Sequence, residues 1–310
     1  MMKKKKRKIW LWFLSSIIII FAILIGTALG IVSSKLNKME KVTIDKSNLG
    51  IEENNIENYK NKKEIKNIAL FGIDSDDDNN GRSDAIMIAT IDAEHNKLKL
   101  TSLMRDSYVN IEGYGMDKLN HAYAYGGPQL SIKTINENFG LNIDSFMSVN
   151  FSSLPVIIDL LDGVDISIAE DEVPYVPGIS EAGTYTLTGG QALSYSRIRS
   201  TNGDDYRRTE RQRTLLNALF TEASTMPKSS YLTMLDSILP YVKTNMSSSE
   251  ILSLGTSVFS SYSNGLQQLR FPLDGYSEGT MIDGVYYLTF DQAKTKQQVM
   301  DYIFDDKNPQ

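Results

Sequence analysis

The chain of 310 residues contains no cysteine and only two histidines, His95 and His121. Without cysteine there are no disulfides, and thiol catalysis and cysteine-based zinc or iron–sulfur sites are excluded. With two histidines, a histidine-rich metal site and a Ser-His-Asp hydrolase are both poorly supported. Hydrophobic residues make up 41% of the sequence, which is enough to bury a substantial core without covalent cross-links.

A long uncharged stretch lies near the N-terminus. Six of the first eight residues are Lys or Arg, and residues 9–32 follow without a charge. About 20 apolar residues in a helix match the roughly 30 Å hydrocarbon layer of a bilayer. We therefore expect a basic cytoplasmic tail over residues 1–8 and a transmembrane helix over residues 9–32. A cleaved signal peptide is the alternative, although its apolar region usually spans only about 7–15 residues.

The distribution of charge predicts orientation and partners. Cations that precede a first span stay in the cytoplasm, so the rest of the chain is expected outside the cell membrane. Without those six cations, 26 basic residues stand against 38 acidic ones, a net charge of −12. Such a body repels a polyphosphate duplex, so nucleic acid is not an expected partner. The polar residues 33–66 predict a solvated extracellular stalk before a domain over residues 67–310.

Short apolar runs alternate with helical patterns after the predicted stalk. We expect strands at 67–73, 85–91, 98–103, 163–168 and 286–290, and helices at 129–138, 152–161, 205–220 and 291–304. The sequence from Thr188 to Gln191 resembles a capping box that opens a further helix. Strands interleaved with helices predict an α/β fold, a layered α/β/α domain whose central sheet is flanked by helices. The strand order does not follow from these patterns.

Two aspartates flank an acidic loop. Asp74 ends one predicted strand and Asp84 begins the next, so the loop can bring their carboxylates together. Hard oxygen ligands of this kind suit Mg²⁺, which keeps several waters and bridges to phosphates; Mn²⁺ is the alternative metal. Asp74, Asp76 and Asp78 have the spacing of a calcium-binding EF-hand, but Asn79 stands where that loop requires Gly. A solvated acidic loop is the simplest alternative.

Arginines are concentrated in one short stretch. Six of them fall within 17 residues: Arg197, Arg199, Arg207, Arg208, Arg211 and Arg213. On a helix, Arg208, Arg211 and Gln212 stand at i, i+3 and i+4 and share one face. A solvated basic face usually mixes Lys with Arg, but no Lys occurs between residues 133 and 228. Because the planar guanidinium binds phosphate through two hydrogen bonds, the stretch predicts a phosphate site.

A further arginine, Arg105, stands beside Asp106 at the end of a predicted strand, where α/β sheets place ligand contacts. A buried Arg–Asp pair or a surface arginine is the alternative. Together with the two aspartates and the arginine-rich stretch, Arg105 predicts an anion site for a diphosphate.

Seven collinear motifs over roughly half of the chain carry a family resemblance. They are residues 67–74 (NIALFGID), 82–84 (RSD), 102–106 (SLMRD), 118–127 (KLNHAYAYGG), 161–165 (LDGVD), 183–199 (GTYTLTGGQALSYSRIR) and 204–213 (DDYRRTERQR). In these motifs the sequence resembles the LytR–CpsA–Psr family of cell-envelope phosphotransferases. The resemblance implies one α/β domain with a hydrophobic channel for a polyprenyl tail.

The resemblance also implies roles for individual residues. Asp74 and Asp84 are the implied Mg²⁺ ligands. The implied diphosphate ligands are Arg105, Arg197, Arg199, Arg208 and Gln212, with Arg82 and Arg211 as supports. We expect catalytic roles for Arg105, Asp106 and Arg199, and the candidate base is either Asp106 or a metal-linked carboxylate. Asn120 and Tyr123 are expected to shape the pocket. Arg207 replaces a common Gly and either adds a phosphate ligand or stiffens the turn.

The function implied by the resemblance is Mg²⁺-dependent transfer of a glycopolymer, such as teichoic acid or capsular polysaccharide, from polyprenyl diphosphate to peptidoglycan. The implied partners are that lipid-linked glycopolymer, peptidoglycan and the membrane. Two alternatives stay open. One is a pyrophosphatase that releases polyprenyl phosphate to water. The other is a non-catalytic transcriptional attenuator, although a cytoplasmic tail of about eight residues is too short to fold a DNA-binding module.

Overall fold

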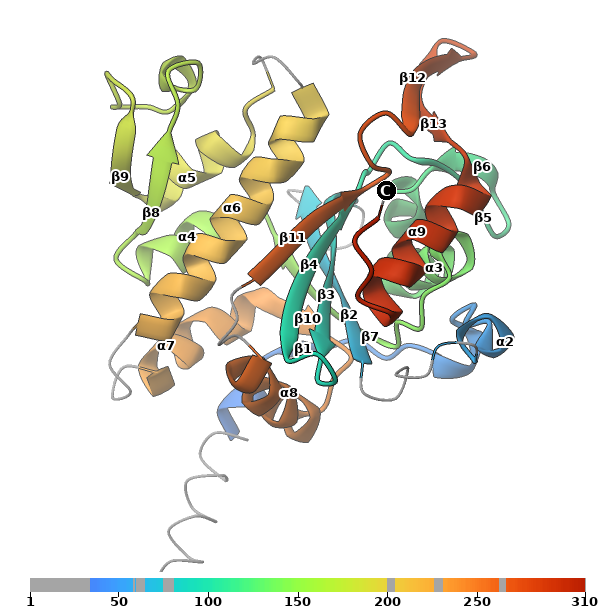
Figure 1. The fold of residues 1–310 in the computed structure, drawn as a ribbon. Helices are drawn as coiled ribbons and strands as arrows, with labels where there is room; N and C mark the ends of the chain where they lie inside the picture. Colours follow the sequence, from blue (N-terminus) through green and yellow to red (C-terminus); the bar gives the residue numbers. More distant parts are fainter. Residues whose placement is uncertain are drawn as a thin grey trace, which may run out of the picture.

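The computed structural model describes residues 34–57, 59, 65–74, 81–199, 204–225, 231–261 and 266–309. These residues form a mixed α/β fold in which helices flank a central sheet (Figure 1), so the α/β part of the predicted fold class is confirmed. The predicted basic tail and transmembrane helix lie outside the described residues. None of the helices within the described ranges has both the length and the apolar character needed to span a bilayer.

The central sheet has seven strands within the described residues, in the order β1-β10-β7-β2-β3-β4-β11. Their bounds are β1 Glu40–Lys41, β2 Ile65–Asp74, β3 Arg82–Asp92, β4 Lys97–Leu103, β7 Ser145–Asn150, β10 Val242–Thr244 and β11 Leu266–Phe271. Strand β2 runs parallel to β7 and antiparallel to β3, while β4 is antiparallel to β3 and parallel to β11. The carboxyl ends of β2, β4, β7 and β11 therefore meet at one edge.

Side chains alternate between the two faces of the sheet, as the period of a strand requires. On β2, Phe71 points into the main hydrophobic core, whereas Leu70 lines a cavity on the other side. We call these sides the core face and the cavity face. The core face is covered by α3 (His121–Phe139) and α9 (Gln292–Phe304). The cavity face is covered by α4 (Leu154–Asp159), α5 (Gly189–Ser196), α6 (Asp204–Thr225) and α8 (Ser248–Ser261).

Within the described residues, three β-hairpins stand beyond the sheet. One consists of β8 (Val164–Ile168) and β9 (Gly183–Leu187), which share a small core with α4, α5 and α6. The others are β5 (Tyr108–Ile111) with β6 (Gly115–Lys118), and β12 (Ser277–Ile282) with β13 (Val285–Phe290). In Figure 1 the first hairpin lies at the left and the other two at the upper right. The upper ends of the central strands lie between them.

Several local sequence signals act as expected. Thr188 caps α5 through the predicted capping box with Gln191, and Asp291 caps α9 by accepting a hydrogen bond from the Lys294 amide. Helix α3 begins earlier than predicted, because its first turns are joined to the rest across non-helical Gly126 and Gly127. The remaining described elements are α2 Glu53–Ile56, α7 Tyr231–Ile238 and the 3₁₀ turns η1 Lys46–Asn48, η3 Val173–Tyr175 and η4 Leu239–Tyr241.

The predicted stalk is wrong for the part of it that the structure describes. Leu49, Ile56 and Tyr59 are buried in the main core, and Leu36 and Met39 pack with Leu239 in a smaller cluster. These apolar residues follow no regular period, so the polar composition around them concealed their burial. Strand β1 also joins the sheet by pairing with β10. The folded domain therefore includes residues N-terminal to the predicted boundary at residue 67.

Candidate functional site

The predicted site residues gather at the edge where the parallel strands end. Asp74 is the last residue of β2, Asn150 the last of β7, and Arg105 follows β4 by two residues. Arg82 begins β3 at the same edge, since it pairs in register with Asp74. Carboxyl ends of strands are where α/β sheets bind ligands, because the loops that follow converge there.

A β-bulge places Asp84. Gly72 pairs with Ala85 and Ile73 pairs with Ser83, so Asp84 is the additional residue on β3. A bulge turns a side chain out of the regular alternation, and bulges are common beside active sites. The Asp84 carboxylate is almost fully buried. Its Oδ2 accepts a hydrogen bond from Arg105 Nη1 at 2.6 Å and its Oδ1 accepts one from Asn120 Nδ2 at 3.0 Å.

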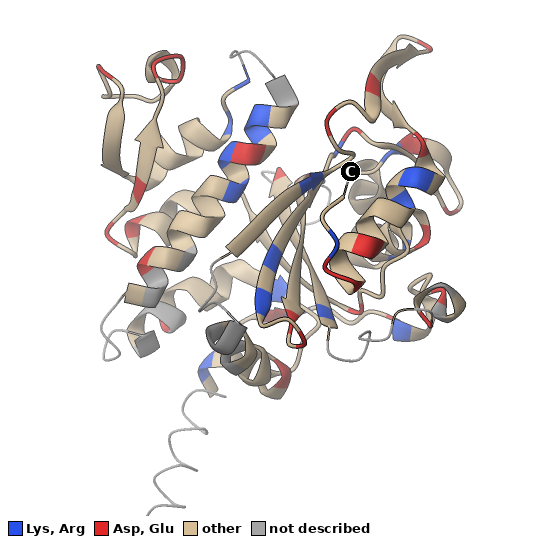
Figure 2. Ribbon diagram, in the orientation of Figure 1, with Lys and Arg blue, Asp and Glu red and all other residues tan. Residues whose placement is uncertain are grey.

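A charged pocket of about 250 Å³ lies at this edge. It is lined by Asp74, Asp84, Phe151, Ser196, Arg197, Arg199, Arg208 and Gln212. Six of the predicted site residues are thus brought together from β2, β3, the end of α5 and the start of α6. Figure 2 shows Lys and Arg concentrated on the first half of α6 and the segment before it, while the β8–β9 hairpin carries acidic residues.

The arginines of the pocket differ in burial. Arg197 Nη2 lies 3.2 Å from Asp74 Oδ1, and Arg199 Nη2 lies 4.0 Å from Asp84 Oδ2. Their side chains are 53% and 58% exposed, so both can turn from the carboxylates toward an incoming anion. Arg208, by contrast, is only 3% exposed at the wall of the pocket. The pocket therefore combines one fixed cation with two adaptable ones.

Arg211, which was expected to support the diphosphate site, does not line the pocket. With about 3.6 residues per turn, Arg211 and Gln212 fall on opposite sides of Arg208 around the helix. Gln212 faces the pocket. Arg211 donates from Nε to Glu172 Oε1 at 2.6 Å and from Nη1 to the carbonyl of Ile198 at 3.1 Å. It therefore holds the backbone between Arg197 and Arg199.

Glu172 was not predicted from the sequence. It is 4% exposed, and its Oε2 accepts a hydrogen bond from the Ala169 amide at 2.9 Å. A carboxylate in an acidic loop gives no signal that it will be buried against a distant arginine. Burial, followed by the nearby charge of Glu172, raises the pKa of Tyr195 to about 12 and keeps its hydroxyl neutral. Arg207 pairs with Asp171 and does not line the pocket.

Arg105 and Asp106 are held beside the pocket and do not line it. Arg105 Nε lies 3.2 Å from Asp106 Oδ2, and Lys118 Nζ lies 2.8 Å from Asp106 Oδ1. Both oxygens of Asp106 are therefore in ion pairs. This arrangement makes Asp106 a positioning residue for Arg105, and its role as the base stays a prediction. Arg82, which was expected to support the diphosphate site, is exposed and also stands outside the pocket lining.

The two residues expected to shape the pocket act at different distances from it. Asn120 fixes Asp84 directly through the hydrogen bond to Oδ1. Tyr123 packs its ring against Phe71 in the main core, with centroids 5.3 Å apart, and its hydroxyl lies 3.5 Å from Ser148 Oγ. The charged pocket thus depends on Asn120 for carboxylate orientation and on Tyr123 only through packing under β2.

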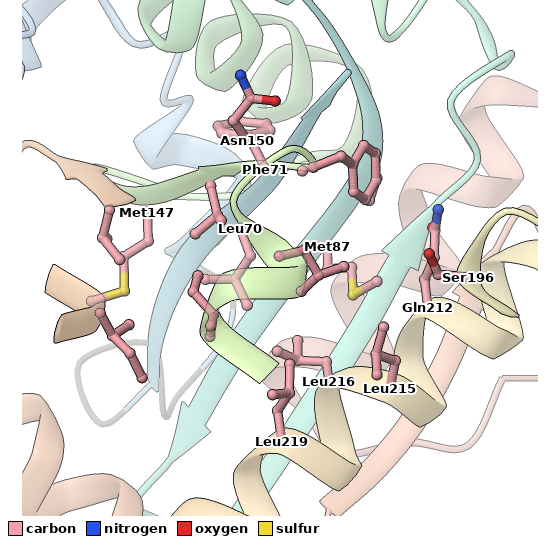
Figure 3. Close-up of a pocket in the computed structure, with 18 residues that line it drawn as sticks. Leu70, Phe71, Met87, Met147, Asn150, Ser196, Gln212, Leu215, Leu216 and Leu219 are labelled. Carbon is pink, nitrogen blue, oxygen red and sulfur yellow. The ribbon is translucent and has the colours of Figure 1, made fainter. Parts of the chain in front are cut away.

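An apolar cavity of about 290 Å³ adjoins the charged pocket on the cavity face. Phe151, Ser196 and Gln212 line both spaces. Figure 3 shows Leu215, Leu216 and Leu219 of α6 facing the sheet, where the cavity is lined by Leu70, Met87 and Met147. Ile238 and Val242 also line the cavity, and the charged pocket borders it at Gln212. The spacing of the α6 leucines predicts an apolar face, but it does not reveal that the face is hollow.

The donor set allows a metal to be evaluated. Within the residues that the structure describes, no cluster of three or more His, Asp or Glu side chains could hold an ion. Asp74 and Asp84 line the same pocket, and Mg²⁺ is commonly bound by one or two carboxylates together with waters and substrate phosphates. Two carboxylates beside a phosphate-sized opening fit such a shared ion. Binding of Mg²⁺ by these two residues stays a prediction.

The fold and the site define a mixed α/β protein that can bind an amphiphilic anion, with its charge among the arginines and its apolar part beneath α6. A model of the LytR_cpsA_psr family matches residues 29–302. The chain belongs to this family, and the predicted resemblance is confirmed.

The relatives include transferases. The chain is 32% identical to the polyisoprenyl-teichoic acid–peptidoglycan teichoic acid transferase TagU of Bacillus mycoides (strain KBAB4) over 305 residues, 93% of this chain and 95% of the relative. It is similar to the structure of TagT bound to LI-WTA, with a TM-score of 0.68, 27% identity and coverage of 86% of this chain and 98% of that one.

A further solved structure bears on the apolar cavity. The LytR-CPS2A-psr family protein YwtF (TagT) with bound octaprenyl pyrophosphate lipid matches at a TM-score of 0.64 and 26% identity, over 86% of this chain and 98% of that one. The expectation that this chain is an enzyme of the phosphotransferase class agrees with the names of these relatives.

Proposed function

We propose that this protein transfers a glycopolymer of the teichoic acid type from a polyprenyl-diphosphate carrier to peptidoglycan. The observation that supports this most directly is the junction of the charged pocket with the apolar cavity at Phe151, Ser196 and Gln212. A diphosphate in the pocket would have its polyprenyl tail in the cavity, where each buried CH₂ contributes about 0.8 kcal/mol. The names of the relatives TagU and TagT agree with this substrate class.

In the proposed reaction, a hydroxyl of the acceptor glycan attacks the phosphorus nearer the glycopolymer. A new P–O bond forms, the bond to polyprenyl phosphate breaks, and the hydroxyl proton ends on the released phosphate monoester. Arg197, Arg199 and Arg208 neutralise the phosphate oxygens and stabilise charge that develops on them in the transition state. Mg²⁺ held by Asp74 and Asp84 would supply further positive charge when bound.

Arg105 and Arg211 stabilise this arrangement without lining the charged pocket. Arg105 orients the Asp84 carboxylate and adds positive charge next to the pocket. Arg211 fixes the carbonyl of Ile198, which sets the directions in which Arg197 and Arg199 leave the backbone. Prior positioning of this kind is a major contribution of the protein in phosphoryl transfer, because little of the covalent chemistry involves its side chains.

The proposal includes a location. A span over residues 9–32 with its basic tail in the cytoplasm would hold the domain on the outer side of the cell membrane, where the lipid-linked substrate and peptidoglycan both lie. Protease treatment of intact cells tests this orientation. We expect cleavage in the domain without lysis, whereas protection until lysis would overturn the proposed location and favour a cytoplasmic role.

The transfer itself is tested with the purified full chain in detergent and a polyprenyl-diphosphate-linked teichoic acid precursor, with and without peptidoglycan. Mass spectrometry should find glycopolymer joined to peptidoglycan through a phosphodiester, formed only with acceptor and lost after chelation of divalent metal. Release of polyprenyl phosphate at the same rate without acceptor would contradict the proposal and identify a pyrophosphatase.

A further inference from the structure

An exposed aromatic cluster lies on α3 and the β5–β6 hairpin, on the side of the core face. Tyr114, in the turn between β5 and β6, stacks on Tyr125 of α3 with ring centroids 4.2 Å apart and planes 8° from parallel. The two side chains are 55% and 41% exposed. Large rings held together in solvent mark interaction surfaces more often than scattered single ones do. We call Tyr114, Asp117, His121, Tyr125 and Tyr287 the aromatic patch.

Polar groups fix the rings of the aromatic patch. The Tyr125 hydroxyl donates to Asp117 Oδ2 at 2.7 Å, and His121 Nδ1 lies 2.9 Å from the same oxygen. The Tyr287 hydroxyl, from β13, lies 3.4 Å from Asp117 Oδ1. Burial acts to raise the pKa of Asp117, but hydrogen bonds from Tyr125 and His121 outweigh it and leave the pKa below its ordinary value. The patch therefore presents rigid ring faces around an ionised carboxylate.

A chain of contacts joins the aromatic patch to the charged pocket. Lys118, the residue after Asp117, stands over the Tyr287 ring at 5.7 Å and reaches Asp106 Oδ1 at 2.8 Å. Asp106 holds Arg105, and Arg105 holds Asp84 in the pocket lining. A ligand seated on the patch would therefore extend toward the phosphate site from the side opposite the apolar cavity.

The direction of approach matters for the reaction, and here the inference rests on the proposed function. In phosphoryl transfer the attacking and leaving oxygens lie roughly in line through phosphorus. If the polyprenyl phosphate departs toward the cavity beneath α6, the acceptor hydroxyl must come from the other side. The aromatic patch lies there, since α3 and the β5–β6 and β12–β13 hairpins stand across the strand ends from α5 and α6 (Figure 1).

The chemistry of the aromatic patch fits a sugar chain. A pyranose ring presents an apolar C–H face, which suits the face of a tyrosine, and a rim of hydroxyls, which suits Asp117 and the tyrosine hydroxyls. A bilayer is disfavoured as the ligand of the patch. The expected membrane span over residues 9–32 directly precedes residues 34–41, and in Figure 1 the patch elements lie at the opposite end of the molecule from residues 34–41. We propose that the aromatic patch binds the glycan strand of the peptidoglycan acceptor and directs its hydroxyl toward the charged pocket.

Binding of soluble peptidoglycan glycan oligosaccharides to the full chain in detergent tests this directly, by calorimetry and without any lipid donor. Tyr114→Ala should raise the Kd about tenfold, because a stacked ring face is lost. Tyr114→Phe keeps the ring and should bind as the wild type does. Tyr175→Ala, which removes an exposed tyrosine on η3 away from the patch, is the matched control and should leave the Kd unchanged.

Steady-state transfer supplies the second readout. Tyr114→Ala should raise the KM for acceptor about tenfold while the Kd for polyprenyl diphosphate stays at the wild-type value. Equal acceptor affinity in Tyr114→Ala and wild type would overturn the inference, as would an equal loss in Tyr175→Ala. If the oligosaccharide binds through Tyr114 but no protein transfers glycopolymer, the glycan site stands and the proposed function fails.

Discussion

On the core face of the sheet, Ile132, Ile135 and Phe139 of α3 are fully buried against β2 and β3. On the cavity face, Leu215, Leu216 and Leu219 of α6 border about 290 Å³ of apolar space. Because protein interiors are close-packed, an empty apolar cavity of this size lowers the stability of the fold. Both faces are built on the same alternating strands. The difference agrees with the proposal that one face is filled by the fold and the other holds the lipid part of the substrate.

Charge follows the same division. On the core face, buried Lys99 lies 3.3 Å from Asp92 and 3.0 Å from Asp306, and it donates to the carbonyl of Tyr302. These charges are neutralised within the fold, as buried charges must be. At the edge of the cavity face, Arg197 and Arg199 are more than half exposed. Their charge is available to a substrate.

The largest expected effect is on these exposed arginines. Arg199→Ala should lower kcat for transfer about 10²–10³-fold, because a donor to the developing phosphate charge is removed. The unfolding midpoint should not change, since the side chain is 58% exposed. Arg82→Ala removes an exposed arginine at the same edge that does not line the pocket, and it should retain activity within about twofold. Equal losses of activity in Arg199→Ala and Arg82→Ala would contradict the distinction between arginines that line the pocket and arginines that do not.

Truncating a side chain to Ala should lower the free energy of unfolding by different amounts on the two faces of the sheet. Ile135→Ala in the filled core should cost about 2–5 kcal/mol. Leu216→Ala should cost only about 1 kcal/mol, because that side chain already borders empty space and forfeits fewer contacts. Urea denaturation of the full chain in detergent measures both. Similar costs at the two positions would show that the cavity face is packed as tightly as the core face.

Leu216→Ala and Ile135→Ala should also separate in substrate affinity. The Leu216 variant should bind polyprenyl diphosphate more weakly, whereas the Ile135 variant should keep its affinity under conditions where it is folded. Affinity lost only in the Ile135 variant would place the lipid elsewhere.

A smaller effect on transfer is expected from Glu172, which supports the pocket without lining it. Glu172→Gln removes the negative charge that holds Arg211, so the segment carrying Arg197 and Arg199 should be less well positioned. Transfer should fall about tenfold. Glu170→Gln neutralises an exposed neighbour on the same loop and should leave transfer unchanged. A Glu172 variant with full activity would show that Arg211 needs no anionic partner.

The smallest expected effect concerns pH and the core face. Burial acts to raise the pKa of Asp306, but hydrogen bonds from Lys97 and Lys99 outweigh it and hold the pKa below its ordinary value. A carboxylate with a lowered pKa in the folded state stabilises the protein above its unfolded pKa, about 3.9, and loses this contribution as pH falls through the folded value.

In Asp306→Asn the free energy of unfolding should therefore decline less between pH 6 and pH 3 than it does in the wild type. Asp283→Asn, at an exposed position on the β12–β13 turn, should follow the wild-type pH profile. Parallel profiles for wild type and Asp306→Asn would contradict the role assigned to this ion pair.

Hydrophobic periodicity and sequence motifs predicted many of the secondary-structure elements. The runs that became β2, β3 and β4, the capping box of α5 and the helix α6 are each local signals, so the sequence reveals them. The strand order and the bulge at Asp84 depend on pairing between distant segments, and no local pattern encodes them. The burial of Leu49, Ile56 and Tyr59 was concealed by polar neighbours.

The same limit applies to the site. The density of arginines pointed to the anion site, but it could not distinguish arginines that face the pocket from those that support it. Arg208 and Arg211 are three residues apart on one helix, but Arg208 lines the pocket whereas Arg211 donates to Glu172 and Ile198. The pairing of Glu172 with Arg211 depends on the tertiary fold, which places the Glu172 loop against α6.

A crystal structure of the protein with polyprenyl diphosphate tests the central claim most directly. The account predicts phosphate oxygens within hydrogen-bond distance of Arg197, Arg199 and Arg208, and the tail between α6 and the sheet along Leu216 and Met87. A diphosphate bound away from these arginines, or a tail lying outside the cavity, would contradict it.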